Sequence, residues 1–134
     1  MDTVQTAKQQ IYVHIRWMVR RDMPGVLQIE QQVFEAPWTD EDFLRCMRQR
    51  NCICMVVEHG EKIVAFMIYE LHKKKLHILN FAVHHSWRRQ GIGAQMVTKL
   101  ISKLCHHRRK FLTLEVRETN LATQLFFHQQ GLCA

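Results

Sequence analysis

Apolar and polar positions alternate along the chain with two different periods, which predicts a mixture of strands and amphipathic helices. Runs rich in β-branched and aromatic residues predict strands over 11–19, 52–58, 62–71, 76–83 and 111–117. Apolar residues at helical spacing predict helices from Asp22 to Phe34, from Thr39 to about Arg48, over 91–107 and over 120–130.

Residues with known preferences for helix ends and turns support these boundaries. Asp22 is placed to cap the first helix, with Pro24 in its first turn. Thr39 offers an N-cap to the second helix, whose acidic first turn suits the helix dipole. Gly131 closes the last helix, and the polar turn at 59–62 joins two strands as a hairpin.

The predicted elements follow the order strand, two helices, three strands, helix, strand, helix. This order indicates an α/β fold of the α+β kind, a mixed sheet with helices on both faces. We expect residues 1–10 to form a flexible leader and residues 11–134 to form a single domain.

The composition is that of an ordinary soluble globular protein, with 47% hydrophobic and 23% charged residues. No apolar run reaches the roughly 18 residues of a membrane span, and the polar first ten residues do not resemble a signal peptide. We therefore expect a cytoplasmic protein with no membrane partner. In that compartment the five cysteines do not predict a disulfide framework, and Cys52 and Cys54 are interpreted as small apolar strand residues.

The net charge and the histidines limit the possible partners and ligands only in part. The net charge of +7 favours polyanionic partners such as nucleic acid, acidic proteins or a phosphorylated cofactor, and does not choose among them. The pairs His84-His85 and His106-His107 are neighbours in sequence, so their side chains point apart. Neither pair makes a ready metal site, and no metal is predicted.

The most informative segment is the loop from Arg88 to Ala94, which follows a predicted strand and opens a predicted helix. Gly91 and Gly93 lie where backbone N–H groups lack intrahelical partners, and Arg88 and Arg89 add positive charge. This combination favours the binding of a pyrophosphate group. The loop lacks the Gly-Lys-Ser/Thr of a Walker motif and the third glycine of a dinucleotide fingerprint. A glycine-rich turn that binds no ligand is the alternative interpretation.

This loop resembles a known family motif. The sequence Arg88-Arg89-Gln90-Gly91-Ile92-Gly93-Ala94 resembles the Arg/Gln-x-x-Gly-x-Gly/Ala motif of the GCN5-related N-acetyltransferase (GNAT) superfamily. The segments 36–39 and 114–117, followed by Asn120, resemble the RimI-like branch, whose enzymes acetylate the N-terminal α-amino group of a ribosomal protein. The similarity covers roughly residues 15–132. It implies the acyl-CoA N-acyltransferase fold, with a central and mostly antiparallel sheet.

The resemblance also implies a cosubstrate, acetyl-CoA, and roles for individual residues. The strand that contains Phe81 and Val83 would pair with the pantetheine arm, and the Val83 N–H would polarise the thioester carbonyl. Residues 88–94 would hold the pyrophosphate, and Asn120 would contact the cofactor. As an alternative, Asn120 is a plain residue at a helix N-terminus.

Glu115 is the candidate general base. Strand alternation places Thr113, Glu115 and Arg117 on one face, and the flanking apolar residues Leu114 and Val116 favour a raised pKa for the carboxyl group. A base is needed because an α-amine, with a reference pKa near 8, is mostly protonated at pH 7. The alternative is a Glu115–Arg117 ion pair without a catalytic role.

Two features depart from the family. Phe127 stands where the RimI-like branch has the tyrosine that protonates the departing thiolate, so no proton donor is assigned. The family also continues beyond the position of Gly131 with two more strands, so we expect a domain that is incomplete at its C-terminal end. The alternatives are that a partner supplies these strands or that the protein is a diverged binder.

Four functions therefore remain open from the sequence. The first is acetylation of a protein N-terminus, with a ribosomal protein as the leading acceptor. Lysine or small-amine acetylation is the second, and non-catalytic CoA binding is the third. The fourth is nucleic-acid binding through the cluster at 106–110, which we regard as incidental to the main activity.

Overall fold

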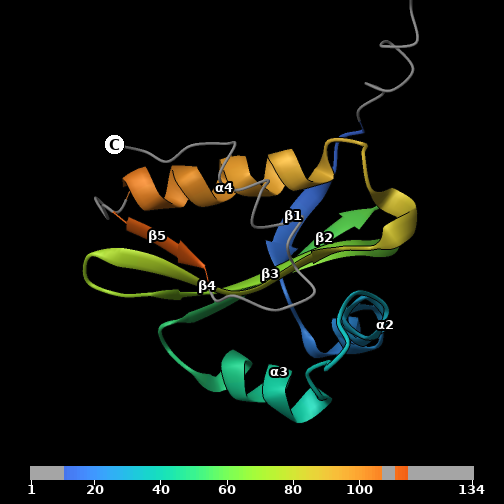
Figure 1. Ribbon diagram of the computed structural model, residues 1–134, viewed down its shortest axis with the longest axis horizontal. Helices are drawn as coiled ribbons and strands as arrows, with labels where there is room; N and C mark the ends of the chain where they lie inside the picture. Colours follow the sequence, from blue (N-terminus) through green and yellow to red (C-terminus); the bar gives the residue numbers. More distant parts are fainter. Residues whose placement is uncertain (1–10, 107–110, 115–134) are drawn as a thin grey trace, which may run out of the picture.

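The computed structural model describes residues 11–106 and 111–114, which form one sheet between helices (Figure 1). In sheet order, the strands are β1 (His14–Trp17), β2 (Cys52–His59), β3 (Lys62–Leu71), β4 (Lys75–Val83) and β5 (Phe111–Leu114). Neighbouring strands are antiparallel, except that β4 and β5 are parallel. The prediction of a mixed, mostly antiparallel sheet is confirmed.

Three α-helices and two short 3₁₀ turns complete the described fold. The helices are α2 (Met23–Val33), α3 (Asp40–Arg48) and α4 (Ile92–His106), and the turns are η1 (Arg20–Asp22) and η2 (His85–Trp87). Helix α4 lies on one face of the sheet, while α2 and α3 lie on the other (Figure 1). The predicted leader, the predicted helix at 120–130 and the predicted end of the last strand lie outside the described residues.

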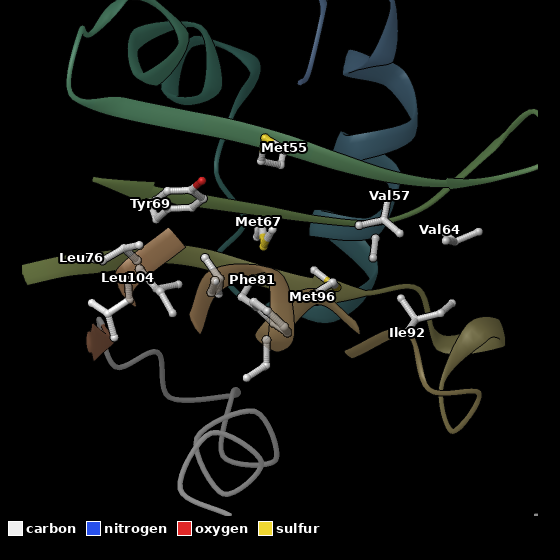
Figure 2. Close-up of a cluster of buried hydrophobic side chains, with 14 residues drawn as sticks. Met55, Val57, Val64, Met67, Tyr69, Leu76, Phe81, Ile92, Met96 and Leu104 are labelled. Carbon is white, nitrogen blue, oxygen red and sulfur yellow. The ribbon is translucent and has the colours of Figure 1, made fainter. Parts of the chain in front are cut away.

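Two hydrophobic cores, one on each face of the sheet, hold these layers together. The core under α4 contains Met55 and Tyr69 from the strands and Met96 and Leu104 from the helix (Figure 2). The core under α2 and α3 centres on Phe43 and on the opposite faces of β2 and β3. Because β2 and β3 are covered on both faces, their sequences are continuous apolar runs rather than alternating ones.

The predicted starts of α2 and α3 differ in whether a side chain caps the helix. Thr39 caps α3 as predicted: its Oγ1 accepts the Asp42 N–H at 3.3 Å, and the Asp42 carboxylate accepts the Thr39 N–H at 2.9 Å. Asp22 occupies the predicted N-cap position of α2, but its side chain makes no capping hydrogen bond there. The Asp22 carboxylate instead accepts two hydrogen bonds from the Arg16 guanidinium, at 2.8 and 2.9 Å, and one from the Val19 N–H at 2.8 Å.

Strand β1 is shorter than predicted because residues 11–13 contact the loop before α4. The Ile11 N–H donates to the Gln90 carbonyl at 3.1 Å. The Gln95 side chain donates to the Ile11 carbonyl at 2.6 Å and accepts the Val13 N–H at 3.3 Å. The chain pairs regularly with β2 only from His14 onward.

The cysteines fit the prediction in one respect and depart from it in another. Cys52 and Cys54 are buried free thiols in β2, as expected for small apolar residues. Cys105 is disulfide-bonded, which the sequence analysis did not anticipate. Among the described residues, no helix combines the length and the apolar character needed to cross a membrane.

The Arg16–Asp22 pair gives the fold a defined acid sensitivity. The hydrogen bonds from Arg16 lower the pKa of the Asp22 carboxyl, which is only 4% exposed. A depressed folded-state pKa stabilises the protein above the unfolded value of about 3.9, and this contribution disappears as the pH falls through the folded-state pKa.

We expect Asp22→Asn to lower the free energy of unfolding by about 2 kcal/mol at pH 7, because it weakens a largely buried charged pair. The difference from the parent should begin to shrink below about pH 4, where the unfolded parent binds a proton, and should be lost as the pH falls through the lowered folded-state pKa of Asp22. Urea denaturation at pH 7, 5 and 3 measures this, with the exposed Glu61→Gln as control. A pH-independent difference would contradict the role assigned to the ion pair.

Candidate functional site: the end of β4 and the start of α4

The loop between β4 and α4 has the conformation of an anion-binding turn. Gly91 has φ 82° and Arg89 has φ 63°, both in the left-handed region, where only glycine is unstrained. The Gly91 carbonyl accepts the Gln95 N–H at 3.2 Å, which makes Gly91 the residue that caps α4. The chain thus turns sharply at Gly91 and directs the first amides of α4 toward the loop.

The first turn of α4 presents free hydrogen-bond donors. Among the described residues, no acceptor lies within hydrogen-bonding distance of the N–H groups of Ile92, Gly93 or Ala94. The Ile92 side chain is buried in the core beneath α4, so a ligand at this turn would meet only its backbone. Three unpaired N–H groups and the positive end of the helix dipole form a site suited to a phosphate group.

Positive charge surrounds this turn. The side chains of Arg88 and Arg89 are exposed, and the Arg88 Nε donates to the Val83 carbonyl at 3.3 Å, which ties the loop to the end of β4. Burial, together with the charges of Arg88 and His84, lowers the pKa of His85, so neutral His85 adds no charge to the site at pH 7. The two arginines therefore supply the cations beside the amides.

Gln95 holds the loop in place, which the sequence analysis missed. Its side chain links residues 11–13 to the start of α4 and donates to the Gly91 carbonyl at 3.2 Å. In the sequence, Gln95 or Met96 stands where a dinucleotide fingerprint would have its third glycine, and nothing else distinguishes Gln95. Its structural role depends on a contact 84 residues away, which local pattern does not reveal.

The end of β4 has a backbone edge beside this turn that no described strand pairs. Strand β5 pairs with β4 only from Lys75 to Ile78, and within the described residues no strand pairs with 79–83 on that side. The His84 N–H donates to the Val64 carbonyl at 2.9 Å, so His84 and Val64 form a hydrogen-bonded pair. Because bonded and non-bonded pairs alternate in an antiparallel ladder, the N–H and C=O of Val83 point away from β3, toward the open edge.

The backbone of Val83 faces the side of β4 that no described strand pairs, and its role as oxyanion donor remains a prediction, whereas the Phe81 side chain faces the core. No described residue accepts the Val83 N–H. The Phe81 side chain is buried in the core under α4, and its N–H donates to the Asn80 Oδ1 at 2.9 Å. A cofactor beside β4 would thus meet the Phe81 backbone and not its ring.

Glu30 and Asn80 form a buried polar connection behind this edge, and the sequence analysis did not identify it. The Asn80 Nδ2 donates to the Glu30 Oε1 at 2.7 Å, and the Trp38 N–H donates to the Glu30 Oε2 at 2.8 Å. Both side chains are almost fully buried, at 0% and 2% exposed. The connection links α2 and the loop between α2 and α3 to the residue that immediately precedes Phe81.

The remaining predicted site residues, Glu115 and Asn120, lie outside the described residues. The strand before them has the predicted alternation: Leu112 and Leu114 pack against the core under α4, while Thr113 Oγ1 contacts His77 Nδ1 at 2.6 Å. Phe127, the residue in place of the family tyrosine, also lies outside. Among the described residues, no three histidine, cysteine or acidic side chains converge as metal ligands would.

Comparisons with known proteins agree with this geometry. The sequence model of the acetyltransferase (GNAT) family matches residues 23–132. The [ribosomal protein bS18]-alanine N-acetyltransferase of Escherichia coli (strain K12) is 29% identical over 110 residues, which are 82% of this chain and 74% of the relative. The corresponding enzyme of Haemophilus ducreyi is 26% identical over 117 residues, 87% of this chain and 80% of the relative.

Solved structures show the same fold. The crystal structure of the Escherichia coli ribosomal-protein-S18-alanine N-acetyltransferase has a TM-score of 0.78 and 26% identity, and the match covers 90% of this chain and 77% of that one. Ard1 from Thermoplasma volcanium has a TM-score of 0.80 and 24% identity, with 90% and 82% covered.

Proposed function

The chain belongs to the acetyltransferase (GNAT) family, and on this premise we propose that it transfers the acetyl group of acetyl-CoA to the N-terminal α-amino group of a protein. The similarity to alanine N-acetyltransferases that act on ribosomal protein bS18 supports a ribosomal protein as acceptor. Such an acceptor is met in the cytoplasm. The observation that carries the proposal is the set of unpaired N–H groups at Ile92–Ala94, beside the open edge of β4.

In the proposed complex, the pyrophosphate of acetyl-CoA lies on the loop of residues 88–94. The amides of the first turn of α4 donate to its oxygens, and Arg88 and Arg89 balance its charge. The pantetheine arm extends along the open edge of β4, where the backbone of Phe81 and Val83 faces it. The Val83 N–H is then free to stabilise the oxyanion that forms as the amine attacks the thioester.

The acceptor chemistry is tested with a peptide that carries an N-terminal alanine and one internal lysine. We expect release of one CoA thiol per acetyl group, with the modification located by mass spectrometry on the α-amino group. Two control peptides, one blocked at its N-terminus and one without lysine, separate the sites. Modification of the blocked peptide at lysine would replace this proposal with ε-amino acetylation.

Glu115→Gln tests the proposed general base. Loss of a positioned base costs about 10²–10⁴ in rate, so we expect kcat at pH 7 to fall by at least about 100-fold while affinity for acetyl-CoA is unchanged. The loss should shrink toward pH 9, because an α-amine with a pKa near 8 is then already neutral. The control is Glu61→Gln, which makes the same change in the exposed turn between β2 and β3. Equal rates at pH 7 for Glu115→Gln and the parent would remove Glu115 from the mechanism.

A further inference from the structure

A pocket lies away from the proposed cofactor site, between α4 and the sheet face formed by β1, β2 and β3. Its volume is about 270 Å³. The walls are mainly apolar and include Ile15, Met55 and Leu71, one residue from each of the three strands. A cavity of about 150 Å³ holds benzene, so this pocket can accommodate a ligand of about ten non-hydrogen atoms.

Two lysines of α4 line the same pocket. Lys99 and Lys103 are four residues apart, so they lie on one side of the helix, and both are partly buried. Helix α4 contains no acidic residue, and none of the ion pairs among the described residues involves either lysine. Like charges at this spacing repel each other, and an anion between them would relieve the repulsion.

A buried hydroxyl group completes the polar side of the pocket. Tyr69 is 2% exposed and lines the pocket, and no described residue hydrogen-bonds to its hydroxyl. Figure 2 shows the ring on the sheet face, with the hydroxyl turned toward the strand of Met55. Burial raises the pKa of Tyr69 to about 12, so the group stays protonated and can donate. A buried hydroxyl without a partner is uncommon and indicates that something polar belongs beside it.

We propose that this pocket binds a small apolar carboxylate, such as a medium-chain fatty acid. The carboxylate lies between the ammonium groups of Lys99 and Lys103 and accepts a hydrogen bond from the Tyr69 hydroxyl. The hydrocarbon chain contacts the apolar walls from β1, β2 and β3. A neutral ligand would leave the lysines uncompensated, and a simple inorganic anion would leave the apolar walls in water.

This site is distinct from the acetyl-CoA site. Lys99 and Lys103 follow Ile92 by seven and eleven residues, so they lie roughly 10 and 16 Å along the helix from its N-terminus. The inference does not rest on the proposed function, because neither the pocket nor its test involves acetyl transfer.

The test is a methyl-NMR titration of the full chain with octanoate, which has ten non-hydrogen atoms. We expect saturable shifts at Ile15, Met55 and Leu71, at least about tenfold weaker binding of octanol and of octylammonium, and an unchanged octanoate affinity in saturating CoA. Octanol binding as tightly as octanoate, displacement of octanoate by CoA, or no saturable shift at these residues would each overturn the proposal.

Variants test the polar contacts separately. The double variant Lys99→Met/Lys103→Met should bind octanoate at least about tenfold more weakly, and Tyr69→Phe about three- to tenfold more weakly. The matched control is Lys62→Met/Lys74→Met, which removes the same charge at two exposed positions outside the pocket. Thermal melts verify that each variant is folded. Equal affinity in the folded Lys99/Lys103 variant and in its control would overturn the proposal.

Discussion

Replacing Gly93 by aspartate should weaken acetyl-CoA binding by at least about 100-fold, which corresponds to ~2.7 kcal/mol. The new carboxylate would stand in the first turn of α4, where the unpaired amides are proposed to hold the pyrophosphate, and like charges repel. The same substitution should not destabilise the fold, because an acidic residue in the first turn of a helix favours the dipole. Calorimetric titration with acetyl-CoA and a thermal melt of the same sample measure both effects.

Gly91→Asp should lose binding to a similar extent, with an added cost in stability. Gly91 has φ 82°, a conformation that strains residues with a side chain by about 1 kcal/mol. Gly60→Asp is the matched control, since Gly60 also has positive φ, 64°, and a Cβ there would meet no atom within 4 Å. Near-parental affinity in Gly93→Asp, or an equal loss in Gly60→Asp, would refute the phosphate site.

The elements of the fold could be predicted because their determinants are local. Helix α4 was predicted over 91–107 and spans Ile92–His106. The prediction succeeded because the glycines and the apolar residues that define this helix lie in one contiguous segment. Thr39 and Asp42 act within one turn of α3, so four consecutive residues were enough to predict the cap. The loop of residues 88–94 could be recognised for the same reason: its glycines and arginines are contiguous.

The errors and omissions involve contacts between residues in different elements of the fold. Asp22 has the local preference of a helix cap, but two strong hydrogen bonds from Arg16 in β1 outweigh it. The Glu30–Asn80 hydrogen bond joins positions 50 residues apart, and a single sequence shows only two polar residues in apolar surroundings. The pocket under α4 likewise combines three strands and a helix, so neither Tyr69 nor the two lysines stand out in the sequence.

The second large effect is expected at the Glu30–Asn80 hydrogen bond, where loss of one partner should destabilise the fold. Asn80→Leu keeps a similar volume but removes the donor to Glu30 Oε1 and the acceptor of the Phe81 N–H. Each buried group that loses its partner costs about 1–3 kcal/mol, so we expect the free energy of unfolding to fall by about 3 kcal/mol. Urea denaturation measures the loss. Asn51→Leu, at an exposed position before β2, is the control and should change stability by less than about 0.5 kcal/mol.

A double-mutant cycle separates this network from simple packing loss. If Asn80 and Glu30 stabilise each other, the variant Glu30→Met/Asn80→Leu should lose about 1–2 kcal/mol less than the sum of the single losses, because no buried carboxyl group then remains to be satisfied. Independent losses would show that the two residues act separately.

Asn80 also holds the amide of Phe81, two residues before Val83, so Asn80→Leu should lower kcat more than Asn51→Leu does even at temperatures where both are fully folded. Unchanged kcat in folded Asn80→Leu would confine this network to a structural role and separate it from the proposed role of the β4 edge in catalysis.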